Sequence, residues 1–264
     1  MIKKLMTHLY YGDPTNDFSL QLAKTLVNSG ADILEIGIPY SDPVSDGEVF
    51  QKASNRALTN GTTPFDVFDG IKKLRKLGIK VPIYITSYFG PVYKMGIEKF
   101  IQKVVKVNAQ GVIIPDILLE EQNELLFLSK KYNISIIQFA TSYSSDERLK
   151  QIISVSSGFI YCISGPNVTG SKNTLNKDTI LLIKRINKLE KEMDRNIPIF
   201  VGFGISTPEQ VKLILNSGGD GVIVGSAIAK IYQDYLDVSL KSLSKVVGFI
   251  KILKKATYVK IKKI

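Results

Sequence analysis

The stretch DILEIGIPYSDPVSDG (residues 32–47) begins as a short run of β-branched and apolar residues and continues into a loop with two prolines. Short runs of this kind recur along the chain, and each is followed by an amphipathic segment with helical periodicity. The eight runs lie at residues 5–11, 32–38, 82–88, 111–116, 134–140, 158–164, 197–203 and 220–225. This alternation predicts an α/β protein with one parallel sheet, and eight repeats favour a closed (β/α)8 TIM barrel.

Helices are predicted between these runs, for example at residues 18–30, 97–108 and 178–193. Two more are expected outside the eightfold repeat, one at 48–61 after the second strand and one at 234–257 near the C-terminus. No long linker interrupts the alternation, so residues 1–264 are predicted to form a single domain. A doubly wound open sheet is the structural alternative.

Composition narrows the class of protein. The formal net charge is +11, but lysines are spread along the chain without an aromatic-interleaved basic motif, which favours a lysine-rich surface over nucleic-acid binding. The single cysteine, Cys162, excludes an internal disulfide and a cysteine-cluster metal site. No secretion signal and no stretch of about 18 apolar residues is visible, so we expect a cytoplasmic protein without a membrane segment.

Two carboxylates lie close to the carboxyl end of the second predicted strand. Glu35 is flanked by Leu34 and Ile36, so its side chain points either into the barrel or towards the helices. Burial there would raise its pKa towards the range that suits reversible proton transfer, although pairing with a Lys or Arg inside the barrel is an alternative. Asp46 follows in the proline-containing loop, which can bring it back to the same end of the barrel as Glu35. There it would be a second carboxylate in a more solvated environment.

Glycine-rich turns follow the last three predicted strands. They are GPNVTGSKN (165–173), GFGIST (202–207) and GSAIAK (225–230), the last of which opens a short helix. Glycines let backbone N–H groups approach an anion, and a helix N-terminus attracts negative charge, so these turns predict a phosphate site. Thr207 stands where a dinucleotide fingerprint would have its third glycine, which argues against a nicotinamide cofactor.

These residues and their order resemble the tryptophan synthase alpha subunit family over essentially the whole chain. The matching motifs are LEIGIPYSDPVSDG (34–47), GDP (12–14), IIPD (113–116), NVTG (167–170), GFGIS (202–206) and VGSAI (224–228). The resemblance implies cleavage of indole-3-glycerol phosphate to indole and glyceraldehyde 3-phosphate. It also implies a pyridoxal-phosphate-dependent beta subunit as partner in an alpha2-beta2 heterotetramer, with no metal or bound cofactor in this chain.

The resemblance also assigns roles to individual residues. Glu35 falls on the family's general acid/base and Asp46 on the partner of the indole nitrogen. The implied substrate-binding residues are Tyr161 near the reacting carbons, Thr169 in the loop after the sixth strand, and the phosphate ligands Gly170, Gly204, Gly225 and Ser226.

Several positions depart from the family's pattern. They lie at residues 45–48, 86–91 and 165–166, and at His8 and Tyr10, where the family usually has an aromatic residue and a threonine. We interpret His8 as a packing substitute for that aromatic residue. The departures leave open a second hypothesis, a catalytically weakened barrel that mainly activates the beta subunit. A third hypothesis is that the chain is another barrel enzyme that acts on a phosphosugar. Only the identity of the substrate would distinguish this hypothesis from the first.

Overall fold

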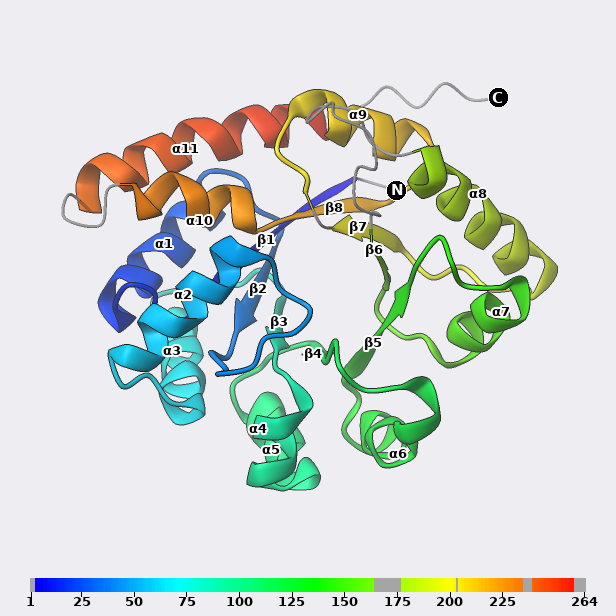
Figure 1. Ribbon diagram of the computed structural model, residues 1–264, viewed down its shortest axis with the longest axis horizontal. Helices are drawn as coiled ribbons and strands as arrows, with labels where there is room; N and C mark the ends of the chain where they lie inside the picture. Colours follow the sequence, from blue (N-terminus) through cyan, green and yellow to red (C-terminus); the bar gives the residue numbers. More distant parts are fainter. Residues whose placement is uncertain (1–2, 164–176, 203, 235–238, 259–264) are drawn as a thin grey trace.

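Eight parallel strands close into one barrel in the computed structural model, which describes residues 3–163, 177–202, 204–234 and 239–258 (Figure 1). Neighbours pair in chain order, and the last strand pairs with the first. The strands are β1 (Lys4–Tyr10), β2 (Ile33–Gly37), β3 (Ile83–Thr86), β4 (Gly111–Ile113), β5 (Ser135–Ala140), β6 (Ile160–Ile163), β7 (Ile199–Gly202) and β8 (Gly221–Val224). The predicted (β/α)8 barrel is confirmed, and the open sheet is wrong.

Helices surround the barrel (Figure 1). They are α1 (Asn16–Asn28), α2 (Glu48–Thr59), α3 (Pro64–Lys76), α4 (Phe89–Met95), α5 (Ile97–Lys106), α6 (Asn123–Tyr132), α7 (Asp146–Val155), α8 (Lys177–Glu192), α9 (Pro208–Asn216), α10 (Ser226–Gln233) and α11 (Ser239–Ala256), with a 3-10 turn η1 (Leu119–Glu121).

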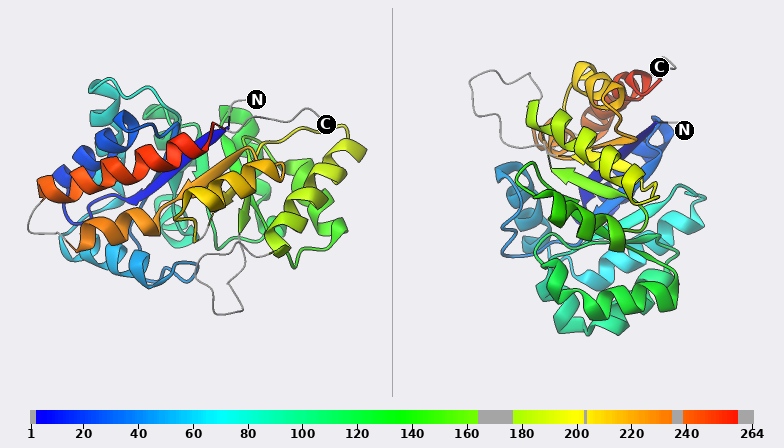
Figure 2. Two further views of the ribbon diagram at one scale, coloured as in Figure 1. Left: turned by 90° about the horizontal axis from the view of Figure 1, so that it is seen from above. Right: turned by 90° about the vertical axis from the view of Figure 1, so that its right-hand side faces the viewer.

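Both helices expected outside the eightfold repeat are present. The first is α2, and the second is α11, which begins a few residues later than predicted. Figure 2 shows α11 along the outside of the barrel, where it contacts α1 and α10. The short helix α4 was not predicted, because its sequence FGPVYKM carries a glycine and a proline that argue against a helix.

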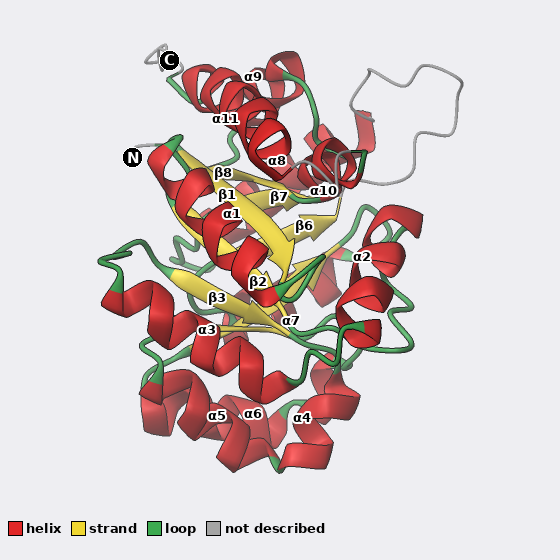
Figure 3. Cartoon of the chain, turned by 90° about the vertical axis from the view of Figure 1, so that its left-hand side faces the viewer, coloured by secondary structure: helices red, strands yellow, loops and turns green. Residues whose placement is uncertain are grey.

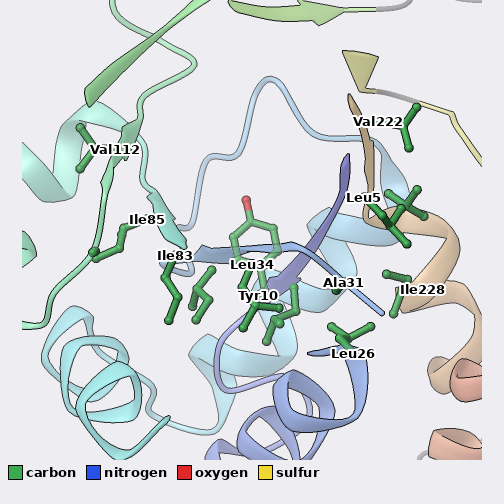
Figure 4. Close-up of a cluster of buried hydrophobic side chains, with 14 of the residues drawn as sticks. Leu5, Tyr10, Leu26, Ala31, Leu34, Ile83, Ile85, Val112, Val222 and Ile228 are labelled. Carbon is green, nitrogen blue, oxygen red and sulfur yellow. The ribbon is translucent and has the colours of Figure 1, made fainter. Parts of the chain in front are cut away.

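Side-chain alternation along the strands separates two apolar layers. One set of strand residues, including Leu5, Leu34 and Val222, packs with helix residues such as Leu26 and Ile228 (Figure 4). The alternate set forms a separate cluster from Met6, Ile33, Tyr84, Ile113, Ile137, Phe159, Tyr161, Phe200 and Ile223. Because successive strand residues face opposite sides, this second set fills the barrel interior.

Helix α2 lies beside the carboxyl ends of the strands (Figure 3). A buried ion pair fixes it there: Arg56 of α2 donates two hydrogen bonds, of 2.7 and 2.9 Å, to the fully buried carboxylate of Asp13 after β1. Tyr232 of α10 donates a third hydrogen bond to the same carboxylate, at 2.5 Å. The loop that precedes α2 is therefore anchored on the side of the barrel where the strands end.

No helix among the residues that the structure describes is both long and apolar enough to cross a lipid bilayer.

Candidate active site

A cavity of about 320 Å³ opens at the carboxyl ends of the strands. Strands β1 to β6 and β8 each contribute a side chain to its wall, and the loops after β2, β3, β4, β7 and β8 complete it together with the start of α2. Six of the eight residues singled out from the sequence line it, namely Glu35, Asp46, Tyr161, Gly204, Gly225 and Ser226. The other two, Thr169 and Gly170, lie outside the described residues.

Glu35 points into the barrel. Its neighbours Leu34 and Ile36 belong to the layer under the helices, so alternation turns the carboxyl group inward, where only 2% of the residue is exposed. Burial raises its pKa from 4.5 to about 8, a hydrogen bond from Thr86 opposes the shift, and the charge of Asp46 adds to it. Within the described part of the chain no Lys or Arg pairs with Glu35, so the alternative of a barrel salt bridge is wrong.

His8 lies directly beside this carboxyl group. Its Nδ1 is 3.3 Å from Oε1 of Glu35. The centroid of its ring lies 4.6 Å from the ring centroid of Phe50 and 5.3 Å from that of Tyr10. Burial lowers the pKa of His8 from 6.5 to about 3, so the imidazole is neutral at physiological pH. The predicted packing role is therefore incomplete, since His8 also places a polar ring next to Glu35.

Asp46 is held by two tyrosines. The hydroxyls of Tyr10 and Tyr88 donate hydrogen bonds to its Oδ2 at 2.5 and 3.1 Å, and the Tyr88 hydroxyl also accepts one from the backbone N–H of Ser45 at 3.0 Å. Burial raises the pKa of Asp46, while the two tyrosine hydrogen bonds lower it. Asp46 is less buried than Glu35, as the sequence predicted, and the two carboxyl groups share one cavity.

Tyr161 stands on β6 inside the barrel. Its ring lies 5.0 Å from that of Phe139 on β5, and burial raises its pKa well above 10. A Cβ at Gly202 on the neighbouring strand β7 would clash with the Tyr161 hydroxyl, so the glycine there makes room for the phenol. The charges of Glu35 and Asp46 also raise the pKa of Tyr161, which places it in the same electrostatic environment.

The glycine turns after β7 and β8 form another part of the wall. Gly204 has a φ of +76°, which suits glycine, and Gly225 precedes α10 at the cavity. A Cβ at Gly225 would lie 2.5 Å from Cζ of Phe50, so only glycine fits without a shift. Thr207 caps α9 by accepting a hydrogen bond from the Gln210 N–H, which is why a threonine stands there.

Sequence reasoning missed several residues of this wall, among them Thr86, Tyr88 and Phe50. Thr86 and Tyr88 belong to the segment TSYFGP at 86–91, whose departure from the family pattern was the available signal. Nothing in the sequence marked Phe50 as a site residue, because an aromatic residue in an amphipathic helix is most simply interpreted as part of the hydrophobic core. In the part of the chain that the structure describes, no group of three or more His, Cys, Asp or Glu side chains could hold a metal ion.

A family model described as tryptophan synthase alpha chain matches residues 2–258. The chain belongs to the tryptophan synthase alpha chain family. Among curated alpha chains it is 42% identical to that of Methanocaldococcus jannaschii over 86% of this chain and 78% of the relative. It is 38% identical to that of Carboxydothermus hydrogenoformans over 89% of this chain and 85% of the relative.

Solved structures of the tryptophan synthase family agree with the barrel. The A-subunit from Pyrococcus furiosus superposes with a TM-score of 0.86 at 28% identity, covering 96% of this chain and 99% of that one. A chain of Mycobacterium tuberculosis tryptophan synthase gives a TM-score of 0.86 at 27% identity, covering 98% and 93%. The fold expected from the resemblance is thereby confirmed over nearly the full length.

Proposed function

We propose that this chain is the carbon–carbon lyase of tryptophan biosynthesis that cleaves indole-3-glycerol phosphate to indole and glyceraldehyde 3-phosphate. One observation carries the proposal: a buried carboxyl group of raised pKa and a second, tyrosine-bound carboxylate face one cavity, whose wall also contains two glycine turns and a helix N-terminus. Family membership supports the same reaction.

Glu35 serves as the acid. With a pKa near 8 it carries a proton at neutral pH, and it can deliver that proton to C3 of the indole ring. Protonation at C3 leaves a positive charge that is shared with the ring nitrogen. Asp46, held by Tyr10 and Tyr88, accepts the hydrogen bond of the ring N–H and stabilises that charge.

Glu35 then serves as the base. Its carboxylate takes the proton from the side-chain hydroxyl next to C3, and the hydroxyl oxygen becomes the aldehyde carbonyl as the carbon–carbon bond breaks. The electron pair of that bond returns to the ring and neutralises the iminium, which gives indole. Glu35 ends with the proton it began with, so the cycle closes without another group.

The phosphate group is proposed to bind at the turns after β7 and β8. Gly204, Gly225 and Ser226 line the cavity there, and α10 begins at Ser226 with N–H groups that lack helical acceptors. A helix N-terminus carries roughly half a positive charge, which favours a phosphate dianion. The family resemblance assigns Thr169 and Gly170 to the same phosphate site, and both lie outside the described residues.

The partner is proposed to be a beta subunit that carries pyridoxal phosphate and consumes indole, in an alpha2-beta2 assembly in the cytoplasm. Apolar side chains exposed in loops after β2, β4 and β5 support docking at this end of the barrel. Val44 is 77% exposed, Leu118 62% and Tyr143 86%. Solved relatives include a chain of tryptophan synthase from Mycobacterium tuberculosis. No cofactor is proposed for this chain.

A spectrophotometric assay of indole release from indole-3-glycerol phosphate tests the proposal, with and without a beta subunit. We expect slow release by the chain alone and faster release with the partner. Glu35→Gln should lower kcat by a factor of about 100 to 10,000, the usual contribution of a general acid/base. The matched control is Glu98→Gln on the surface of α5, which should keep wild-type activity.

Wild-type release of indole by Glu35→Gln would disprove the proton-transfer role. The alternative, a barrel that mainly activates its partner, predicts little release from either variant or the wild type, together with full activation of the beta subunit. The retained pair of carboxyl groups in one cavity favours the lyase.

A further inference from the structure

The two oxygens of Glu35 have different surroundings. Thr86, at the end of the adjacent strand β3, donates a hydrogen bond of 2.6 Å to Oε1. Nδ1 of His8 lies 3.3 Å from the same oxygen, on the opposite neighbour β1. By contrast, Oε2 is buried and has no hydrogen-bond partner among the side chains and backbone groups that the structure describes.

The contact between Glu35 and Thr86 depends on strand register. Glu35 pairs with Tyr84 across β2 and β3, and Thr86 lies one inward-facing position further along, level with Gly37. From that position the Thr86 hydroxyl reaches back to the carboxyl group of Glu35. Both side chains are at least nine-tenths buried, so water does not compete for this hydrogen bond.

We propose that Thr86 is a positioning residue for the reaction: its hydroxyl fixes Oε1 of Glu35 as an acceptor, so that Oε2 carries the proton exchanged with the substrate. The inference rests on the proposed lyase function and concerns the same cavity. It assigns a role to a residue of the segment at 86–91 that the sequence marked only as a departure from the family.

The chemical reason is the choice between two protonated forms. The hydroxyl oxygen of a protonated carboxyl group is a weaker acceptor than its carbonyl oxygen, so the hydrogen bond from Thr86 to Oε1 favours the form with the proton on Oε2. The hydrogen bond also limits rotation of the carboxyl group, which keeps the acid in one geometry for both proton transfers.

Other ionisable groups around Glu35 stay in place in the variants proposed below. His8 and Tyr10 face it from β1, Asp46 from the loop after β2, and Tyr161 from β6. Because Thr86 does not ionise, its replacement changes the titration of Glu35 through the lost hydrogen bond.

The test compares Thr86→Val and Thr86→Ser with a matched control, Thr7→Val. Thr7 lies on β1, is fully buried and has an Oγ1 without a hydrogen-bond partner in the described structure, so the same isosteric change there removes no contact with Glu35. Two readouts are needed: the kcat and KM of indole release, and the infrared carbonyl band of protonated Glu35 in the free protein. Subtraction of the Glu35→Gln spectrum isolates that band.

We expect Thr86→Val to lower kcat about tenfold, the factor that corresponds to ~1.4 kcal/mol, with little change in KM. The Glu35 titration should move about one pH unit upward, because the lost hydrogen bond favoured the ionised form. Thr86→Ser should restore both values, and Thr7→Val should change neither.

The inference would be overturned if Thr86→Val kept the wild-type kcat and the wild-type titration of Glu35. In that case, indole release by the wild type would still support the proposed function. If Thr86→Val did not fold, Thr86→Ala would take its place in both measurements. Wild-type protein that released no indole would overturn the proposed function, while the infrared titration of the free protein would still decide whether Thr86 holds Glu35.

Discussion

The hydroxyl of Tyr10, at the end of β1, donates a 2.5 Å hydrogen bond to Oδ2 of Asp46, which lies 36 residues further along the chain. Tyr88 donates a second hydrogen bond to the same oxygen at 3.1 Å. Each proposed catalytic carboxyl group therefore has one oxygen held by hydroxyl groups. Asp46 is held by two tyrosines and Glu35 by Thr86.

Tyr10→Phe is expected to lower the kcat of indole release by a factor of about ten to about 150, because a hydrogen bond to a charged group is worth ~1.5–3 kcal/mol. Loss of the hydroxyl removes a hydrogen bond that lowers the pKa of Asp46, so that pKa rises further. The acid limb of the pH–rate profile should therefore move to higher pH. Tyr11→Phe is the control, since Tyr11 is equally buried but lies outside the cavity. Equal effects of the two changes would contradict the role of Tyr10.

Glu35 is expected to make the folded protein less stable as pH rises. In the unfolded chain it loses its proton near pH 4.5, whereas in the fold it keeps the proton up to about pH 8. Between these values the folded state binds more protons, so stability falls with rising pH. Glu35→Gln should therefore gain stability relative to wild type between about pH 5 and about pH 8, as measured by urea unfolding. Glu98→Gln, whose carboxyl pKa is lowered by Lys131, should show no such gain.

His8 should produce the opposite pH dependence. Burial lowers its pKa from 6.5 to about 3, so between these values the unfolded chain binds the extra proton and stability falls as pH falls. The stability of His8→Phe relative to wild type should therefore increase when the pH drops from about 7 to about 4. Because packing differences do not depend on pH, only the change with pH is diagnostic. A difference that stays constant over this interval would show that His8 is not buried in neutral form.

Gly225→Ala is expected to impair substrate binding more than turnover. The added Cβ would lie 2.5 Å from Cζ of Phe50 and 3.0 Å from Cβ of His8, so the wall beside α10 must shift. Overpacking of this kind costs ~1–3 kcal/mol, which corresponds to a KM higher by a factor of about five to about 150. Inhibition by inorganic phosphate should weaken in parallel. Gly248→Ala on the exposed face of α11, where a Cβ meets nothing, should leave KM unchanged.

Much of the fold could be predicted because the chain repeats one simple pattern. Alternating apolar runs and amphipathic segments indicated eight strands and the extra helix α2 without any long-range information. The pattern did not decide whether Glu35 faced the helices or the barrel interior. That choice follows from the position of Leu34 and Ile36 in the layer under the helices, which only the closed barrel makes visible.

The proposed carboxyl pair was visible in sequence because Glu35 and Asp46 are neighbours along the chain. Their partners were not, because each contact crosses between strands or loops. Thr86 meets Glu35 across 51 residues and Tyr88 meets Asp46 across 42. Such contacts depend on strand register, which a single sequence specifies poorly for short parallel strands. In the sequence, Thr86 and Tyr88 therefore stood out only as part of a segment that departs from the family pattern.

A buried ion pair holds α2 against the barrel. Arg56 is the bidentate partner of Asp13, whose carboxylate is fully buried, so Arg56→Met would leave that charge without its cation. Removing one partner of a buried pair typically costs ~3–5 kcal/mol, and urea unfolding should show a loss of that size. Lys52→Met, on the same helix but in an exposed pair with Glu48, is the matched control and should change stability little. Activity should fall only in Arg56→Met, because α2 fixes the loop that carries Asp46. Equal losses of stability in the two variants would show that the Arg56–Asp13 pair does not anchor this helix.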